Sequence, residues 1–352
     1  MQPTMTELVP LIDLAPWHRG APGDRAGVAS ALDRACRSVG FFQVVHHGVA
    51  EPVISAMREE TAAFFSLPEE QKRRACSPSP EINRGYSSRG AEGLAYSLGV
   101  ERPPDLFEAF NLGDDDVDLD DPAVAAERHR IFAPNIWPAD RPSLRPALVA
   151  YFAEAQRVAR LLTDVFALAL GLPDGFFVPY TSHSTDTLRV VDYRTEPGDD
   201  DPLDGQVGMG AHTDYGICTV LYADLVPGLQ IVGPDGSWVD VVPVPGALLV
   251  NLGDLTAQWT NDRWRSTVHR VLPPARLPDR TNLRRSAAFF HDGNHDALIE
   301  CLPTCTGPGA PPKYEPVTAG EHLMRKLLGP RTLQHSTAVD TAGDRLETVR
   351  RQ

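Results

Sequence analysis

Cysteine is scarce in this sequence. Its 352 residues include five cysteines: Cys36, Cys76, Cys218, Cys301 and Cys305. A small, odd number fits reduced thiols in a reducing compartment and argues against a disulfide framework. Cys301 and Cys305 resemble half of a zinc site, but no second Cys or His pair at zinc spacing accompanies them, so we expect ordinary thiols.

Positive charge is also in short supply. Lys and Arg total 33 against 47 Asp and Glu, which gives a net charge of −14 with no basic stripe. We therefore expect no nucleic-acid partner and no membrane partner. No stretch approaches the roughly 18 apolar residues of a membrane span, and the N-terminus lacks the pattern of a secretory signal. A cytoplasmic location is the expectation.

The apolar pattern changes character along the chain. Helical spacing of apolar residues predicts helices over residues 24–40, 51–65 and 144–170. Short β-rich runs then alternate with turn signals, in "TLRVVDY", "ICTVLY", "LQIV", "SWVDVV", "ALLVNL", "TVHRVL" and "RRSAAFF". Such spacing indicates an antiparallel sandwich or a small barrel. The acidic, turn-rich segment 196–205 is expected to form a loop that acts as a lid, with a permanently disordered surface loop as the alternative.

A histidine and an aspartate open one of these runs, "MGAHTDYGICTV" at residues 209–220. Because strand side chains alternate, His212 and Asp214 share one face. His269, in the later strand "TVHRVL", can supply a third donor, and two imidazoles with one carboxylate are the ligands of non-haem iron(II) oxygenases. Taken alone, His-x-Asp is a common hydrogen-bonded surface pair and a lone histidine is commonly a buried structural residue.

A second pair of polar residues lies two apart in "NLRRSAAFFHDG", residues 282–293. Strand alternation places Arg284 and Ser286 on one face, where a guanidinium and a hydroxyl can together bind a carboxylate. Arg285 falls on the other face, and we expect its stem to lie on an outer layer with its charge in solvent. A surface arginine beside an exposed serine is the simpler alternative.

Several long phrases of the chain together resemble one enzyme family. The phrases "HTDYG", "STVHRV", "RRS", "GLQIV" and "VNLGDLTAQWTNDRWRS", with "GFFQVVHHGV" and "RGYSSRGAEGLAYSLG" nearer the N-terminus, resemble the iron(II)- and 2-oxoglutarate-dependent dioxygenases of the isopenicillin N synthase-like branch. The likeness runs from about Val9 to Cys305. It implies a mainly β fold with flanking helices around a double-stranded β-helix, or jelly roll.

The same resemblance implies roles for individual residues. His212, Asp214 and His269 match the iron ligands, and Arg284, Ser286 and Tyr193 match the residues that bind 2-oxoglutarate. The expected reaction consumes dioxygen and 2-oxoglutarate, releases succinate and carbon dioxide, and oxidises a C–H bond, most simply by hydroxylation, with desaturation and ring formation as alternatives. Five residues are candidates for the substrate pocket: Arg84, Tyr86, Phe107, Phe110 and Phe290.

We expect four segments along the chain. Residues 1–125 form an N-terminal helical and mixed region that packs on the core, residues 126–180 a long helical segment, residues 181–310 the jelly-roll core, and residues 311–352 a C-terminal helix and tail. The substrate is expected to be a small molecule of specialised metabolism, such as antibiotic biosynthesis, and the protein to be a monomer or a weak homodimer.

Three other functions fit parts of the pattern. An iron oxidase of the same fold can work without 2-oxoglutarate, and release of succinate distinguishes the two. A jelly-roll hydrolase or isomerase with zinc or manganese would need no dioxygen. A non-catalytic binding module would be favoured if a metal ligand were missing, and all three are present.

Overall fold

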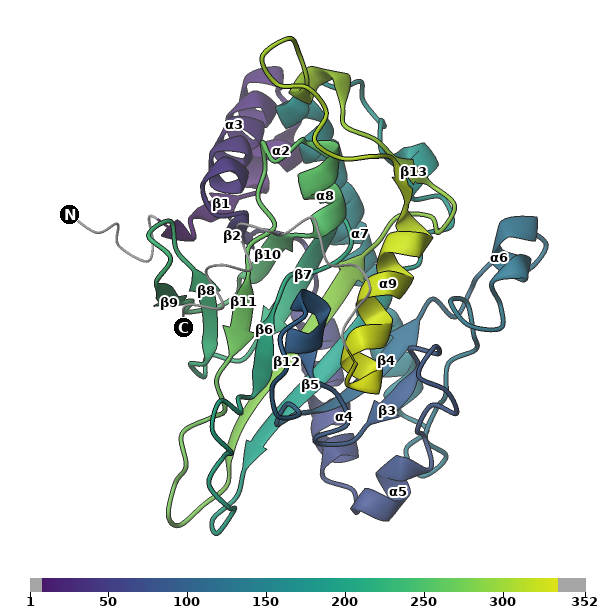
Figure 1. The fold of residues 1–352 in the computed structure, drawn as a ribbon, viewed down its shortest axis with the longest axis vertical. Coiled ribbons are helices and arrows are strands. Elements are labelled where there is room, and N and C mark those ends of the chain that lie inside the picture. Colours follow the sequence, from purple (N-terminus) through teal and green to yellow (C-terminus); the bar gives the residue numbers. More distant parts are fainter. Residues whose placement is uncertain (1–7, 335–352) are drawn as a thin grey trace.

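Two β-sheets face each other at the centre of the structure (Figure 1). The computed structural model describes residues 8–334. The larger sheet has the strand order β1-β2-β10-β7-β12-β5-β4-β3, and the smaller one has the order β6-β11-β8-β9. Apart from the parallel β1–β2 pair, neighbouring strands run antiparallel. This arrangement is the jelly roll expected from the sequence.

The strands of the two sheets come from most of the chain. They are β1 (Leu11–Asp13), β2 (Phe41–Val45), β3 (Gly85–Ser87), β4 (Glu108–Gly113), β5 (Thr187–Thr195), β6 (Met209–His212), β7 (Cys218–Ala223), β8 (Leu229–Val232), β9 (Trp238–Asp240), β10 (Leu248–Leu252), β11 (His269–Val271) and β12 (Asn282–His291). A separate hairpin pairs β13 (Leu298–Ile299) with β14 (Val317–Thr318). Each β-rich run predicted from the sequence overlaps one of the strands from β5 to β12.

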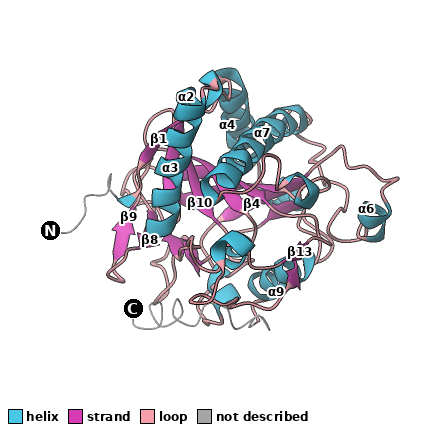
Figure 2. Cartoon of the chain, turned by 90° about the horizontal axis from the view of Figure 1, so that it is seen from above, coloured by secondary structure: helices cyan, strands magenta, loops and turns pink. Residues whose placement is uncertain are grey.

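Helices cover the outer face of the larger sheet. The α-helices are α2 (Ala15–Arg19), α3 (Pro22–Ser38), α4 (Glu51–Phe65), α5 (Glu69–Arg73), α6 (Pro122–Ala126), α7 (Leu144–Leu170), α8 (Asp254–Trp259) and α9 (Ala319–Thr332), and the short 3₁₀ turns are η1 (Leu94–Leu98), η2 (Val178–Tyr180) and η3 (Pro303–Cys305). Figure 2 shows α3, α4 and α7 on one side of the strands and α9 on the opposite side. None of the helices within residues 8–334 is both long and apolar enough to cross a membrane.

The long helix α7 anchors the outer layer. Its apolar side chains are spaced at three and four residues, and one face is buried against α3, α4 and the larger sheet. Phe152 meets Phe289 of β12 edge to face, with ring centroids 5.0 Å apart. Gly171 ends the helix in the left-handed conformation, at φ 69°. The predicted bounds of α4 and α7 agree with the observed ones.

Two predicted segments differ from the structure. The region 1–125 supplies β1 to β4, so it extends the larger sheet at both ends as well as packing on the core. In the segment 126–180, residues 127–143 form turns and loops, because prolines 134, 138 and 142 interrupt helical hydrogen bonding, and α7 begins only at Leu144. At the C-terminus α9 is present, and the predicted tail after residue 334 lies outside the described residues.

A close contact between two glycines shapes the turn beside the carboxyl end of β6. Gly253, just before α8, donates its amide to Ile217, and the next amide, of Asp254, donates to the Asp214 carbonyl at 2.9 Å. A Cβ on Gly253 would lie 2.2 Å from the Gly216 carbonyl oxygen. No side chain fits there, so the backbone contact requires glycine.

Substitution of Gly253 tests this contact. We expect Gly253→Ala to destabilise the protein by about 1–3 kcal/mol, because the backbone at Gly216 must move. The matched control is Gly27→Ala within α3, where a Cβ meets open space and alanine favours the helix. Urea unfolding monitored by tryptophan fluorescence measures both changes. Equal midpoints for the two variants would contradict the expectation.

Candidate metal centre

Strand pairing brings three buried side chains of the predicted triad together. His269, the first residue of β11, pairs with His212, the last residue of β6, and Asp214 lies two residues beyond that strand. The Nε2 atoms of both histidines lie 3.7 Å from Oδ1 of Asp214. One donor atom from each residue lies within 4.8 Å of the others, so the three can bind a single ion. The two histidines come from β6 and β11, which are far apart in the sequence, and Asp214 comes from the turn after β6.

Hydrogen bonds orient both imidazoles. The Nδ1 atom of His212 faces the Gly210 carbonyl at 2.8 Å, and that of His269 faces the Thr267 carbonyl at 3.1 Å. A carbonyl only accepts, so each Nδ1 carries the proton and each Nε2 has a lone pair directed at Asp214. Burial lowers the pKa of His212 to about 3, with the charge of His269 adding to the effect. The His212 imidazole is therefore neutral at pH 7, as metal binding through Nε2 would require.

The carboxylate is held just as firmly. Its Oδ2 atom accepts from Nδ2 of Asn251 at 2.6 Å and from the Thr219 hydroxyl, which leaves Oδ1 for a metal ion. Asn251 lies on β10 and Thr219 on β7, so the larger sheet fixes a ligand presented by the smaller one. Neither residue was predicted from the sequence. The signal for Asn251 was a polar side chain within the otherwise apolar run "ALLVNL".

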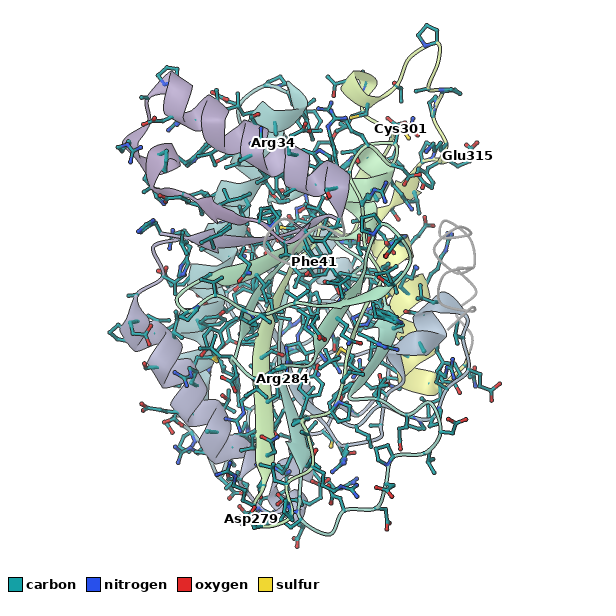
Figure 3. All side chains as sticks on the ribbon, turned by 90° about the vertical axis from the view of Figure 1, so that its left-hand side faces the viewer. Arg34, Phe41, Asp279, Arg284, Cys301 and Glu315 are labelled. Carbon is teal, nitrogen blue, oxygen red and sulfur yellow. The ribbon has the colours of Figure 1, made fainter. Side chains whose placement is uncertain are left out.

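A cavity between the sheets extends from the triad to Arg284. This inner cavity is lined by residues of both sheets, namely Phe41, Arg189, Val191, Tyr193, Met209, His212, Asp214, Thr219, Leu221, Leu229, Asn251, His269, Val271, Arg284, Ser286, Ala288 and Phe290. Figure 3 shows Arg284 on β12 in the interior, between Phe41 and the far loop at Asp279. The aromatic ring of Phe41 packs on His269 at the metal end, with centroids 5.4 Å apart.

Arg284 is the most unusual residue of the inner cavity. Its side chain is 1% exposed, and neither Nε nor Nη1 has a hydrogen-bond partner within residues 8–334. The guanidinium carbon lies 5.2 Å from the ring centroid of Tyr193, which pairs with Arg284 across β5 and β12. A buried guanidinium without an anion is costly, so the chemistry of this pocket fits a carboxylate.

The pairing register agrees with the predicted alternation of β12. Arg284, Ser286, Ala288 and Phe290 all line the inner cavity. Arg285 lies on the outer face, where its guanidinium carbon lies 5.9 Å from the ring centroid of Phe65. Its side chain is 15% exposed, so the guanidinium is held against the protein and does not extend into solvent as predicted. It pairs with the carboxylate of Asp192, which is 1% exposed, at 2.5 Å. Asp192 on the neighbouring strand β5 therefore determines where the Arg285 guanidinium lies, and the sequence around Arg285 does not show this contact.

A second cavity opens on the other side of the triad. This outer cavity shares five lining residues with the inner one: Arg189, Met209, His212, Asp214 and Phe290. Helix α9 contributes Leu323, Met324 and Leu327 to its wall. The loop 196–205, predicted as a lid, lines neither cavity and is instead bound through ion pairs of Asp199 with Arg89 and of Asp201 with Arg276. The cover of the metal centre is therefore α9.

Only one of the five predicted substrate residues presents an available side chain to the outer cavity. Phe290 lines it directly. Arg84 also borders it, but its guanidinium donates to the carbonyls of Asn83, Ile131 and Ala133. The remaining three line neither cavity.

The other three candidates belong to the packing around the site. The Tyr86 hydroxyl donates to Glu69 at 2.8 Å. Phe110 packs on Phe64, with centroids 5.1 Å apart. Phe107 packs behind Tyr193. These positions were predicted from their neighbourhood in the chain. Tyr86 and Phe110 belong to the cluster on the helix-covered side of the larger sheet, whereas Phe107 lies in the cluster between the two sheets and packs on Tyr193.

Comparison with known proteins decides the family. Residues 9–140 match a model described as non-haem dioxygenase in morphine synthesis N-terminal, and residues 184–293 match the 2OG-Fe(II) oxygenase superfamily. The 2-oxoglutarate-Fe(II) type oxidoreductase hxnY of Emericella nidulans is 34% identical over 320 residues, which cover 90% of this chain and 88% of the relative. This chain belongs to the iron(II)- and 2-oxoglutarate-dependent oxygenases.

Other relatives agree with this family. The validamycin A dioxygenase of Streptomyces hygroscopicus subsp. limoneus is 35% identical, with 92% of this oxygenase and 86% of the relative covered. Among solved structures, a Neurospora crassa protein in complex with alpha-KG and thymine superposes with a TM-score of 0.78 at 28% identity, covering 91% of this chain and 96% of that one. The oxygenase therefore uses iron(II), 2-oxoglutarate and dioxygen.

The hydrogen bond from Asn251 offers a test of the metal centre. We expect Asn251→Ala to weaken metal binding about 10–100-fold, because Asp214 loses a partner that orients it. Anaerobic titration with Mn²⁺ as a redox-stable probe measures the dissociation constant. Asn282→Ala is the control, since Asn282 bonds only to the exposed carbonyl of Ala275. An unchanged constant for Asn251→Ala would show that Thr219 alone suffices.

Proposed function

We propose that this oxygenase binds iron(II) through His212, Asp214 and His269 and hydroxylates a small polar molecule in the outer cavity. The geometry of the triad carries the proposal, since two imidazoles and one free carboxylate oxygen converge on one point. Iron(II), with dioxygen and 2-oxoglutarate, supplies the oxidising chemistry, and the co-substrate leaves as succinate and carbon dioxide. The chain itself positions the reactants and excludes water.

The inner cavity is proposed to hold 2-oxoglutarate. Arg284 and the Ser286 hydroxyl bind its distal carboxylate, with Tyr193 contributing a third donor. Burial raises the pKa of Tyr193 to about 12, so its hydroxyl remains protonated and able to donate at neutral pH. The unpartnered guanidinium of Arg284 favours this function over that of an iron oxidase that uses no 2-oxoglutarate.

The outer cavity is proposed to bind the substrate through Arg189 and Phe290. Glu92 holds Arg189 in place through a 2.9 Å bond to Nη2, while the buried Nε of Arg189 has no partner within residues 8–334. That N–H can donate to an oxygen of the substrate, and the Phe290 ring supplies an apolar wall. The substrate is then a compact molecule with both an apolar C–H region and a hydrogen-bond acceptor.

The names of the relatives fit such a substrate. They include homoarginine-6-hydroxylase 2-ODD-233 of Oryza sativa, 30% identical with 91% of this chain and 96% of the relative covered, and proline hydroxylase buaE of Petromyces alliaceus, 30% identical with 90% and 98% covered. With the validamycin A dioxygenase, they support an amino-acid derivative or a polar metabolite of specialised metabolism, including antibiotic biosynthesis.

We further propose a cytoplasmic enzyme that acts as a monomer or weak homodimer without nucleic-acid or membrane partners. The net charge of −14 and five cysteines that are all free support this proposal. Size-exclusion chromatography with light scattering measures the oligomeric state.

Loss of the central carboxylate tests the iron site. We expect Asp214→Ala to abolish oxygen-dependent succinate formation when a library of amino-acid derivatives and polar metabolites is supplied with iron(II) and 2-oxoglutarate. Asp235→Ala is the matched control, because its carboxylate lies in an exposed turn and bonds only to Ser237. Circular dichroism checks that both variants fold. Near-normal succinate formation by folded Asp214→Ala would remove the triad assignment.

Two adjacent arginines test the co-substrate site. We expect Arg284→Ala to raise the 2-oxoglutarate concentration for half-maximal turnover by roughly tenfold to a hundredfold, from the loss of about 1.5–3 kcal/mol in charge-assisted bonds. Arg285→Ala is expected to leave that concentration nearly unchanged and to lower stability, since Asp192 loses its partner. The reverse pattern would assign the co-substrate to the outer face and contradict the proposal.

A further inference from the structure

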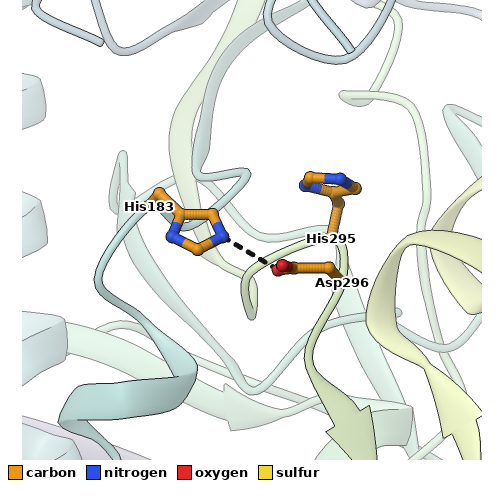
Figure 4. Close-up of side chains that lie close together, drawn as sticks. All are labelled: His183, His295 and Asp296. Atoms are coloured by element: carbon orange, nitrogen blue, oxygen red, sulfur yellow. Dashed lines mark hydrogen bonds and ion pairs between the residues drawn. The ribbon is translucent and has the colours of Figure 1, made fainter. Parts of the chain in front are cut away.

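Outside the iron centre, three metal-ligating side chains meet near the mouth of the outer cavity. His183 lies between η2 and β5, and His295 and Asp296 follow β12 (Figure 4). One donor atom from each lies within 4.8 Å of the others, which makes this the second such cluster in the part of the chain that the structure describes. Neither the reaction nor the binding of 2-oxoglutarate accounts for it.

His183 is flanked by two carboxylates. Its Nε2 lies 2.8 Å from Oδ1 of Asp296, and its Nδ1 lies 3.6 Å from Oδ2 of Asp121 and 3.2 Å from the Ser182 hydroxyl. Only the contact with Asp296 is short enough for a hydrogen bond to a carboxylate, since 3.6 Å is too long for one and Nδ1 also faces the Ser182 hydroxyl. A metal ion between Nε2 and Asp296 would leave Nδ1–H to face Ser182 and Asp121, an arrangement usual for a metal-bound histidine.

One ring nitrogen of His295 is unsatisfied within the part of the chain that the structure describes. Its Nδ1 atom is buried without a hydrogen bond within residues 8–334. Its ring packs edge-on against Phe132, with centroids 5.9 Å apart, and its carbonyl accepts from the Gly320 amide at 2.8 Å. The residue is thus held in place while one of its ring nitrogens is unsatisfied.

The two segments are preorganised by Asn294. Its side chain donates to the Pro179 carbonyl and the Ser182 hydroxyl and accepts from the His183 amide at 2.9 Å. Asn294 therefore fixes the loop that carries His183 against the loop that carries His295. Asp296 is 53% exposed, so an ion can enter from solvent and keep water as a further ligand.

We propose that His183, His295 and Asp296 bind a second divalent ion of the zinc type, with Asp121 orienting His183. Two imidazoles and a carboxylate suit borderline ions such as Zn²⁺. Ligand distances of about 2.0–2.2 Å require the 2.8 Å contact between His183 and Asp296 to open while the His295 ring moves closer. Binding replaces the contact between His183 and Asp296 and releases any proton held on Nε2. The site is independent of the iron centre.

The position of this ion gives it a structural consequence. The surface hollow beside the cluster is lined by Arg130, Ile131 and Met324, which also line the outer cavity. Asp121, the N-cap of α6, would be tied through His183 to the loop after β12. The ion would therefore stabilise the wall of the cavity through which the substrate enters.

Zinc stoichiometry of the metal-stripped, full-length protein tests the proposal. We expect wild type to bind about two Zn²⁺, since the iron centre also accepts zinc, and both Asp214→Ala and His295→Ala to bind about one. The double variant is expected to bind none. His129→Ala, an exposed histidine bonded only to the Ala126 carbonyl, is the control and should match wild type. Elemental analysis after gel filtration provides the count.

A second measurement keeps the test decisive if one variant fails to fold. In the Asp214→Ala protein, Zn²⁺ should raise the thermal midpoint, and adding His295→Ala or the more conservative His183→Gln should remove that shift. The proposal is overturned if Asp214→Ala binds no zinc, or if the cluster variants bind as much as wild type.

Discussion

The antiparallel pairing of β6 with β11 is the constraint on which the metal centre depends. It places His269 opposite His212, and the turn after β6 then presents Asp214 to both imidazoles. The remaining orientation comes from the larger sheet, because Asn251 and Thr219 occupy the second carboxylate oxygen. The metal site therefore exists only when the two sheets are packed together, and the folding of the jelly roll builds it.

Alternation along β12 directs two neighbouring arginines to opposite faces of the larger sheet. Arg284 faces the inner cavity, and Arg285 faces the helical layer, where Asp192 neutralises it. A buried charge must find a counter-charge, and the fold provides one for Arg285 within the chain. For Arg284 the described residues provide none, so the energetic requirement falls on a bound anion. This difference between neighbours distinguishes a binding residue from a structural one.

The mouth of the site is built from parts that lie far apart in the sequence. Helix α9 supplies the cover, and the loop around Ile131 packs beside it against Met324. The proposed second metal cluster lies beside this same loop, at the junction of α6 with the loop after β12. The entrance to the cavity is thus built from segments outside the two sheets, while the proposed iron and co-substrate sites lie on the sheets themselves.

The sequence by itself determined the elements and the residue types of the site. Periodicity located α4, α7 and the β-rich runs, and alternation gave the inward faces of Arg284 and His212, because both signals are local. Only the tertiary structure decided which side chains have partners. The Arg84 guanidinium donates to three backbone carbonyls, and Arg285 pairs with Asp192. The cavity is covered by α9 and not, as predicted, by residues 196–205. Such contacts join residues far apart in the chain, so no local pattern can record them.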